Sequence, residues 1–223
     1  ALAGLAHLPR DAARAKQAID LLIYVETALM GLGDFQTALA RLREAEALAR
    51  TVEEPWYLGQ VRSRMTYELG SVGDLQGAVA AGEEAIELQA GDPDVRLRAG
   101  THVVVARAYY GLGDFRRALE IARRSDALAA LESDPQLAER VMAFSAIWAI
   151  FAQAELGDFV AANARSAETI RASIAEAGPH GKVGGHLGVG RLLLVQGDLP
   201  RAIATLEATL PLCEVGSDLA VYF

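Results

Sequence analysis

The sequence predicts an all-α fold, a right-handed α-α superhelix of about five stacked helical hairpins. A short phrase recurs five times: Gly, Asp, Phe or Leu, two variable positions, and Ala. Its glycines are Gly33, Gly73, Gly113, Gly157 and Gly197, so the spacings by subtraction are 40, 40, 44 and 40 residues. The composition, 52% hydrophobic but only 6% aromatic, is typical of closely packed helices. A fixed period of this length indicates a repeat architecture.

Each recurring phrase is interpreted as the turn of one hairpin. Glycine ends a helix at low cost because it enters the left-handed backbone region without a steric penalty, and the Asp after it can cap the next helix. The Phe or Leu is expected to pack the turn against the core. The Ala five positions after the glycine leaves room where two antiparallel helices approach closely. These alanines are Ala38, Ala78, Ala118, Ala162 and Ala202.

The first helix of each hairpin lies before its turn glycine, and a shorter second helix follows the turn. Apolar residues at helical spacing, such as Val25 and Leu29 before the first turn, indicate the first helices. Prolines are expected to begin four of them, because proline fits the first helical position. These prolines are Pro55, Pro93, Pro135 and Pro179. Asp92 and Asp134, directly before two of them, are predicted caps.

The repeats are expected to form one domain over residues 1–223. One hairpin buries too little surface to be stable alone, so stacked hairpins share one elongated core. The expected repeats are 11–51, 54–90, 92–131, 134–176 and 179–215. The chain has no initiator Met and stops where another apolar helix would start, so we expect it to be a piece of a longer protein.

Charge and cysteine content argue against several classes of protein. A formal net charge of -8 disfavours nucleic acid and acidic membrane surfaces as partners. The one cysteine, Cys213, stands in an apolar helical stretch and is expected to be structural. No run approaches the roughly 18 apolar residues of a membrane span, and no signal segment opens the chain. A cytoplasmic location is expected.

The turn phrase resembles that of the tetratricopeptide repeat (TPR) family, which carries Gly, an acidic or small residue and an aromatic at the turn, then a small residue. The resemblance covers nearly the whole chain, but the period is 40 to 44 instead of 34 residues. The aromatic and glycine positions of the first helices are also weak. The resemblance implies hairpins whose first helices line a concave face, and a non-catalytic role in binding another protein.

Two longer segments carry a narrower resemblance. Residues 4–21, opening with Gly4-Leu5-Ala6-His7-Leu8-Pro9-Arg10, and residues 190–213, around Gly197-Asp198-Leu199-Pro200-Arg201, are involved. They are similar to the C-terminal repeat region of bacterial multidomain proteins that join a class III adenylate or guanylate cyclase domain to a P-loop ATPase domain. This resemblance implies that any catalytic domains lie outside this chain.

No catalytic, cofactor or metal constellation stands out in the sequence, so we expect neither enzyme activity nor a cofactor. Gly181-Lys182 lacks both the earlier glycine and the hydroxyl residue of a phosphate loop. The glycine-rich run 181–190 is interpreted as close helix packing rather than as a ligand loop. The histidines His7, His102, His180 and His186 lack companions at metal-ligand spacing. His102 and His186 both stand eleven residues before a turn glycine, which favours a structural role.

Function is expected on the concave face. Alignment of the first helices by their turn glycines predicts inward positions for eight candidates: Tyr24, Thr27, Arg64, Tyr67, Arg107, Trp148, Phe151 and Arg191. A ninth candidate, Tyr110, is expected one turn further on. Aromatic residues and arginines are enriched at binding hot spots. Trp148 and Phe151 belong to an apolar segment, 144–151, and core packing is the stronger interpretation for them. For the three arginines, structural and binding roles are about equally favoured.

The leading hypothesis is a regulatory or scaffolding module that binds a protein segment or a neighbouring domain of its own chain. The alternative is a small-molecule sensor, in which the glycine-rich fifth repeat and the arginines hold an anionic effector. The sequence leaves a homo-oligomer open.

The fourth repeat is predicted to pack loosely, because its second helix carries Asn163, Ser166 and Thr169 where the other repeats have aliphatic or small apolar residues. Amide hydrogen exchange is therefore expected to be faster in 157–178 than in 113–130. Equal protection of the two segments would contradict this prediction.

Overall fold

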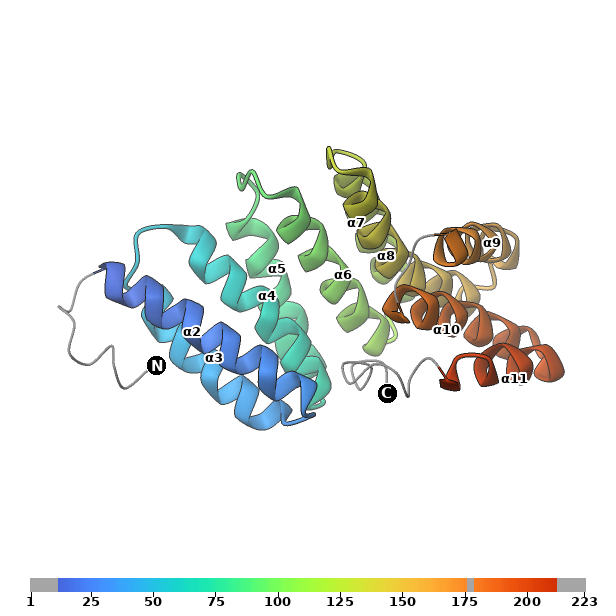
Figure 1. Cartoon of the computed structure of the whole chain (residues 1–223), viewed down its shortest axis with the longest axis horizontal. Coiled ribbons are helices and arrows are strands. Elements are labelled where there is room, and N and C mark those ends of the chain that lie inside the picture. The colour runs from blue at the N-terminus through green and yellow to red at the C-terminus, as the bar shows by residue number, and fades with distance from the viewer. Residues whose placement is uncertain (1–11, 176–178, 212–223) are drawn as a thin grey trace. The chain divides into compact units, whose positions relative to one another are not determined.

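The computed structural model describes residues 12–175 and 179–211. Every regular element in these ranges is an α-helix, and ten helices follow one another along the chain (Figure 1). The all-α prediction is therefore confirmed. The chain divides into two compact units, unit 1 (Ala1–Pro93) and unit 2 (Asp94–Phe223), and each is described by itself. The expectation of a single domain stays a prediction.

Unit 1 consists of two helical hairpins. The first pairs α2 (Ala12–Gly31) with α3 (Phe35–Ala49), and the second pairs α4 (Pro55–Ser71) with α5 (Leu75–Leu88). Helix α4 packs against α3 and, more narrowly, against α2, so the second hairpin covers the first. The fully buried side chains that fill this core include Ile19, Leu42, Ala45, Val61 and Ala85.

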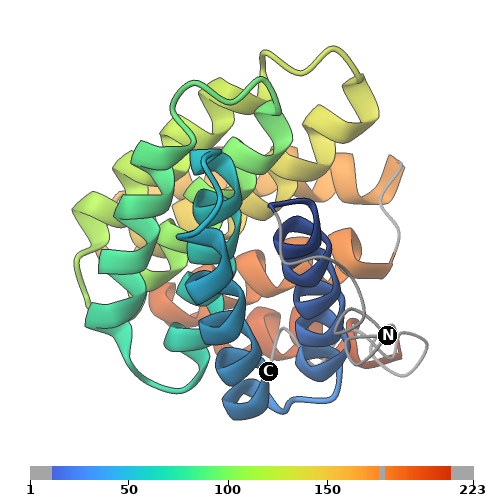
Figure 2. The ribbon, with the colours of Figure 1, turned by 90° about the vertical axis from the view of Figure 1, so that its left-hand side faces the viewer.

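Unit 2 consists of three hairpins. They are α6 (Val95–Gly111) with α7 (Phe115–Ala129), α8 (Pro135–Glu155) with α9 (Phe159–Ala175), and α10 (Pro179–Gln196) with α11 (Leu199–Glu207). The first helices form a row, because α8 packs against both α6 and α10 (Figure 2). Helix α8 also packs on α7, and α10 on α9, so these first helices contact the second helix of the hairpin before them.

All five turn glycines adopt the left-handed backbone that the sequence predicts. Their φ angles are 74°, 90°, 78°, 75° and 82° in chain order. In each turn the aspartate that follows accepts a hydrogen bond from the backbone N–H three residues later. The five small alanines are at most 1% exposed. The expected packing of the turn aromatic or leucine is wrong for two repeats, since Phe159 and Leu199 are 36% and 52% exposed.

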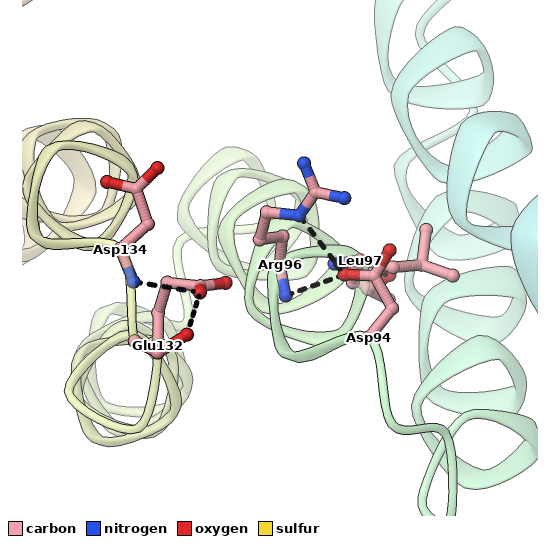
Figure 3. Close-up of polar contacts among 7 residues, drawn as sticks. Asp94, Arg96, Leu97, Glu132 and Asp134 are labelled. Carbon is pink, nitrogen blue, oxygen red and sulfur yellow. Dashed lines mark hydrogen bonds and ion pairs between the residues drawn. The ribbon is translucent and has the colours of Figure 1, made fainter.

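Three of the four prolines begin helices as predicted, but Pro93 does not. Helix α6 begins at Val95 and its cap is Asp94, not Asp92. The Asp94 carboxylate accepts hydrogen bonds from the backbone N–H groups of Arg96 and Leu97, at 3.0 and 3.1 Å (Figure 3). The backbone N–H of Asp92 instead donates to the Gln89 carbonyl, in the turn that ends α5. A carboxylate two residues further along therefore supplies the better cap.

The segment just before α8 contains a different hydrogen bond from the one that caps α6. The backbone N–H of Asp134 donates to Glu132 Oε1 at 3.2 Å, which fixes the chain just before Pro135 (Figure 3). The prolines at the starts of α4, α8 and α10 agree with the predicted register.

Replacing Gly113 with alanine is expected to lower the free energy of unfolding of unit 2 by about 1–2 kcal/mol, because an L-residue is disfavoured at positive φ. No heavy atom lies within 4 Å of the position that a Cβ would take at Gly113, so the cost is one of backbone conformation. Gly100, within α6, has equally open space and no positive φ. Gly100→Ala should therefore raise the free energy of unfolding by about 0.5–1 kcal/mol. Urea unfolding of both variants checks this, and effects of the same sign would contradict it.

Candidate functional site

The candidate residues of unit 1 lie on α2 and α4, and two of them meet. Arg64 Nη1 lies 3.1 Å from Thr27 Oγ1, which connects the first helices of the two hairpins. Tyr24 is 72% exposed and Thr27 is also exposed. Arg64 and Tyr67 are half-buried. The structure thus brings together Thr27 and Arg64 and leaves Tyr24 open to solvent.

Glu26, which the sequence analysis did not single out, is the ionic partner of Arg64. Its side chain is only 2% exposed, and Oε2 lies 2.5 Å from Arg64 Nη1 and 3.2 Å from the Thr27 hydroxyl. A buried carboxylate is costly unless a counter-charge and hydrogen bonds compensate it. Arg64 therefore stabilises the fold. The signal that could have shown this was an acidic residue inside the apolar run of α2.

In unit 2, the structure brings three of the predicted aromatic residues together. Tyr110 from α6 lies against Trp148 and Phe151 from α8, with ring-centroid separations of 5.8 and 5.4 Å. Trp148 and Phe151 meet edge to face at 5.5 Å, a favourable arrangement of aromatic quadrupoles. Phe151 is 8% exposed and belongs to the core, whereas Tyr110 and Trp148 are half-buried. The core interpretation therefore applies to Phe151, whereas Tyr110 and Trp148 are also partly accessible at the surface.

A hydrogen bond and an ion pair connect this aromatic cluster to α10, in the last hairpin of unit 2. Glu155 Oε1 accepts a hydrogen bond from the Tyr110 hydroxyl at 3.1 Å and forms an ion pair with Arg191 Nη2 at 2.7 Å. The side chains of Glu155 and Arg191 are 22% and 40% exposed. We call the surface made by Tyr110, Trp148, Glu155 and Arg191 the α6–α8–α10 face. Arg107 is half-buried on α6, one turn before Tyr110.

The charge states of the α6–α8–α10 face follow from its contacts. Burial raises the pKa of the Tyr110 phenol, so the hydroxyl stays protonated and donates to Glu155 at neutral pH. The hydrogen bond to Glu155 raises the pKa of Arg191. Sequence reasoning missed Glu155 because it stands two residues before Gly157, outside the inward register used to select candidates.

His102 is a structural histidine, in agreement with its repeat position. It is 8% exposed, and its Nδ1 lies 2.8 Å from the Arg98 carbonyl oxygen. Burial is the main cause that lowers the pKa of His102. The hydrogen bond to the Arg98 carbonyl opposes this shift, and the charges of Arg124 and Arg98 lower the pKa further. The folded chain therefore holds His102 neutral under conditions where the unfolded chain begins to take up a proton.

Lowering the pH is consequently expected to destabilise unit 2 through His102. The contribution is fully present above the unfolded pKa of about 6.5 and is lost as the pH falls through the lower folded pKa. Urea unfolding at pH 7.5 and pH 5 measures it, with His102→Gln as the variant that cannot titrate. The loss of stability on acidification should be smaller in His102→Gln than in the unchanged chain. Equal losses would mean that His102 titrates alike in the folded and unfolded states.

The glycine-rich run lies within α10, as the helix-packing interpretation predicts. A Cβ at Gly190 would overlap the Leu206 side chain of α11, and one at Gly188 would touch Ile150 Cδ1 at 3.4 Å. Both glycines therefore permit close approach of neighbouring helices.

Neither a metal-binding cluster nor a membrane-spanning helix occurs in the part of the chain that the structure describes. There, no group of three or more His, Cys, Asp or Glu side chains is placed to hold a metal ion. None of the helices described is long and apolar enough to cross a bilayer. His7, Cys213 and the side chain of His180 lie outside the described residues.

Comparison with known proteins supports the fold. No family model and no curated protein matches the chain. A crystal structure of the nearly identical TPR-like repeats of a kinesin light chain-like protein from Podosopora anserina matches with a TM-score of 0.64 and 17% identity, covering 93% of this chain and 99% of that one. A variant of the same repeats matches with a TM-score of 0.65 and 18% identity, covering 93% and 97%. The chain therefore has an all-helical, TPR-like repeat fold.

Proposed function

We propose that this chain is a non-catalytic protein-interaction module that binds a segment of a partner protein, or of a neighbouring domain, on the α6–α8–α10 face. TPR-like repeats commonly mediate protein–protein interactions. The observation that carries the proposal is the connection of Tyr110, Glu155 and Arg191, which come from three successive hairpins. One ligand lying across this face touches all three hairpins at once.

The physical case rests on residue type and on preorganisation. Tyr, Trp and Arg supply most hot-spot energy in protein interfaces because they combine large contact area with directed hydrogen bonds. Trp148 and Tyr110 are held by neighbouring rings, so binding costs little side-chain entropy. A segment with an apolar anchor and a carbonyl acceptor fits these groups, because the rings and the partly exposed Arg191 side chain lie side by side.

The remaining candidate residues are proposed to contribute to the same role. In unit 1 these are Tyr24, Thr27, Arg64 and Tyr67, of which Tyr24 offers the largest exposed fraction. In unit 2, Arg107 is proposed to take part in binding, with Phe151 supporting the rings from below. Each unit is proposed to bind by its own first-helix face.

The wider setting is also part of the proposal. The resemblance of residues 4–21 and 190–213 to repeats of bacterial cyclase–ATPase proteins supports a cytoplasmic signalling protein whose catalytic domains lie elsewhere. Homo-oligomerisation through the hairpin stack is compatible with this role. Anionic-effector sensing is less favoured, because Glu26 and Glu155 already neutralise Arg64 and Arg191. A rise in melting temperature with nucleotides or small organic acids would reverse that preference.

Selection of peptides from a random display library against the chain tests the proposal. Enriched peptides should carry an aromatic or aliphatic anchor. We expect Trp148→Leu and Arg191→Gln each to weaken their binding about tenfold or more, as for hot-spot residues. Val160→Ser is the control, since Val160 is 86% exposed on α9. Circular dichroism should show that all three variants stay folded.

The proposal fails if no peptide is enriched, or if the enriched peptides bind the Trp148 and Arg191 variants as tightly as the unchanged chain. Binding that Val160→Ser alone disrupts would place the interaction on another surface.

A further inference from the structure

Unit 2 contains a hollow between α7, α8 and α9 that the interaction face does not use. Its volume is about 590 Å³, and it is lined by side chains from all three helices. Small residues make its apolar part, including Ala143 and Ala146 from α8 and Ala161 and Ala164 from α9. We call it the α7–α9 hollow. A hollow of this size admits a small organic molecule.

The fourth repeat differs from its siblings at the positions that form this hollow. Gln153 stands four residues before the turn glycine, where the other repeats have Leu29, Leu69, Tyr109 and Leu193. Ala146 stands eleven residues before it, where the others have Leu22, Arg62, His102 and His186. Ala146 thus stands where the other repeats have a large side chain, and Gln153 places an amide where the others have Leu or Tyr. Both changes occur in one hollow, which is unexpected if they serve packing alone.

Two residues that line the hollow also carry buried hydrogen-bond acceptors that the described residues do not satisfy. Gln153 is 3% exposed, and its Oε1 has no partner in the part of the chain that the structure describes. Asp126 Oδ2 accepts from Arg165 Nη1 at 2.8 Å, but Oδ1 is buried and has no partner among the same residues. A buried acceptor without a donor costs about 1–3 kcal/mol, so a ligand that supplies N–H groups gains from filling the site once these two side chains rotate toward it.

The charge of the lining selects among such ligands. Asp126 and Glu168 are acidic and Arg165 is basic, so the titratable side chains of the lining carry a net charge of -1. An anion would meet two carboxylates and unpaired acceptors, whereas a cation with N–H donors finds complementary groups. The alanines leave space for an apolar body next to the charged end.

We propose that the α7–α9 hollow binds a protonated primary amine carried on a small apolar body, with Gln153 Oε1 and Asp126 Oδ1 as acceptors for its N–H groups. The amine is either that of a free small molecule or that of a lysine side chain. This site is independent of the α6–α8–α10 face, so either proposal can fail without the other.

Nuclear magnetic resonance titration of the 15N-labelled chain at pH 7 tests the proposal with three probes of matched shape. Cyclohexylmethylamine is cationic, cyclohexylmethanol is neutral and cyclohexanecarboxylate is anionic. Saturable shifts are expected for the amine at Gln153, Ala161 and Arg165, with dissociation constants at least tenfold larger for the other two probes. N-acetyl-lysine methylamide distinguishes the two sources: tighter binding than the free amine indicates a lysine of a protein partner, and weaker binding indicates a small molecule.

Gln153→Met removes the unpaired acceptor while keeping the volume of the side chain. Because the unliganded chain loses an unsatisfied buried group, its melting temperature should rise or stay level. The affinity for cyclohexylmethylamine should nevertheless fall about tenfold, the loss of one hydrogen bond to a charged group. Gln60→Met in unit 1 is the matched control, since Gln60 Oε1 is likewise buried and has no partner within residues 12–175 and 179–211. It should leave amine binding unchanged.

Two results would overturn the proposal. One is equal binding of the amine, the alcohol and the carboxylate, which would mean that shape alone fills the hollow. The other is amine binding that Gln153→Met leaves intact.

Discussion

Replacing Arg64 with methionine lowers the free energy of unfolding of unit 1 by about 2–3 kcal/mol. The reason is the carboxylate of Glu26, which is 2% exposed and would lose its counter-charge. Breaking a fully buried ion pair by removing one partner typically costs about 3–5 kcal/mol. The cost expected here is smaller because the Arg64 side chain is 33% exposed, so water reaches part of the site. Thr27 keeps one polar contact with Glu26.

Urea unfolding followed by tryptophan fluorescence measures this loss. The chain has two tryptophans, Trp56 in unit 1 and Trp148 in unit 2. A Trp148→Phe background therefore makes the fluorescence report on unit 1. Arg41→Met is the control, because Arg41 and Glu44 are an exposed i,i+3 pair and its loss should cost about 0.5 kcal/mol or less.

A double variant separates the charge effect from lost packing. Glu26→Met combined with Arg64→Met removes both charges, and replacement of a buried pair by apolar residues is often neutral or stabilising. The double variant should therefore recover most of the stability that Arg64→Met loses. If it is as unstable as the single variant, the Arg64 stem contributes through packing, and the ion pair is not the cause.

The turns of this fold could be predicted from sequence because their causes are local. A glycine at positive φ, an aspartate that caps the next helix and a small alanine all act within six residues of one another. The predicted start of α6 is two residues too early because Asp92 and Asp94 both suit a cap, and only the turn that ends α5 decides between them.

The candidate site could be predicted only in part, because its pairings connect different repeats. Alignment by turn glycines predicted which residues share a helix face, and Tyr110, Trp148 and Arg191 do lie together. Glu26 and Glu155 were missed, since they pair with arginines 38 and 36 residues away across a helix interface. Such a contact depends on how two helices rotate against each other, which a single repeat does not encode.

The α7–α9 hollow did leave a signal in the sequence. Gln153 interrupts a column of Leu and Tyr across the repeats, and comparison of the repeats at that position would have found it. The prediction of loose packing in the fourth repeat rested instead on Asn163, Ser166 and Thr169. Of these, Thr169 lines the hollow.

Ile150→Ala is expected to lower the free energy of unfolding of unit 2 by about 3–4 kcal/mol. Ile150 is completely buried in a cluster with Ala146, Ala154, Ala162 and Leu192. Most of these neighbours are alanines on rigid helices, so they cannot move in to fill the space, and a cavity adds to the lost transfer energy. Ile150→Val should cost only about 1 kcal/mol. Tryptophan fluorescence in a Trp56→Phe background follows unit 2 during urea unfolding.

The size of this effect tests how the hairpins hold together. Ile150 and Ala162 belong to the fourth hairpin, whereas Leu192 belongs to the fifth, so the cluster bridges two repeats. Ile203→Ala is the control, because Ile203 is 55% exposed on α11 and should cost less than about 1 kcal/mol. A cost as small for Ile150 would mean that the two hairpins do not share a core. A large cost with a single unfolding transition means that they unfold as one unit, since neighbouring repeats then depend on each other for burial.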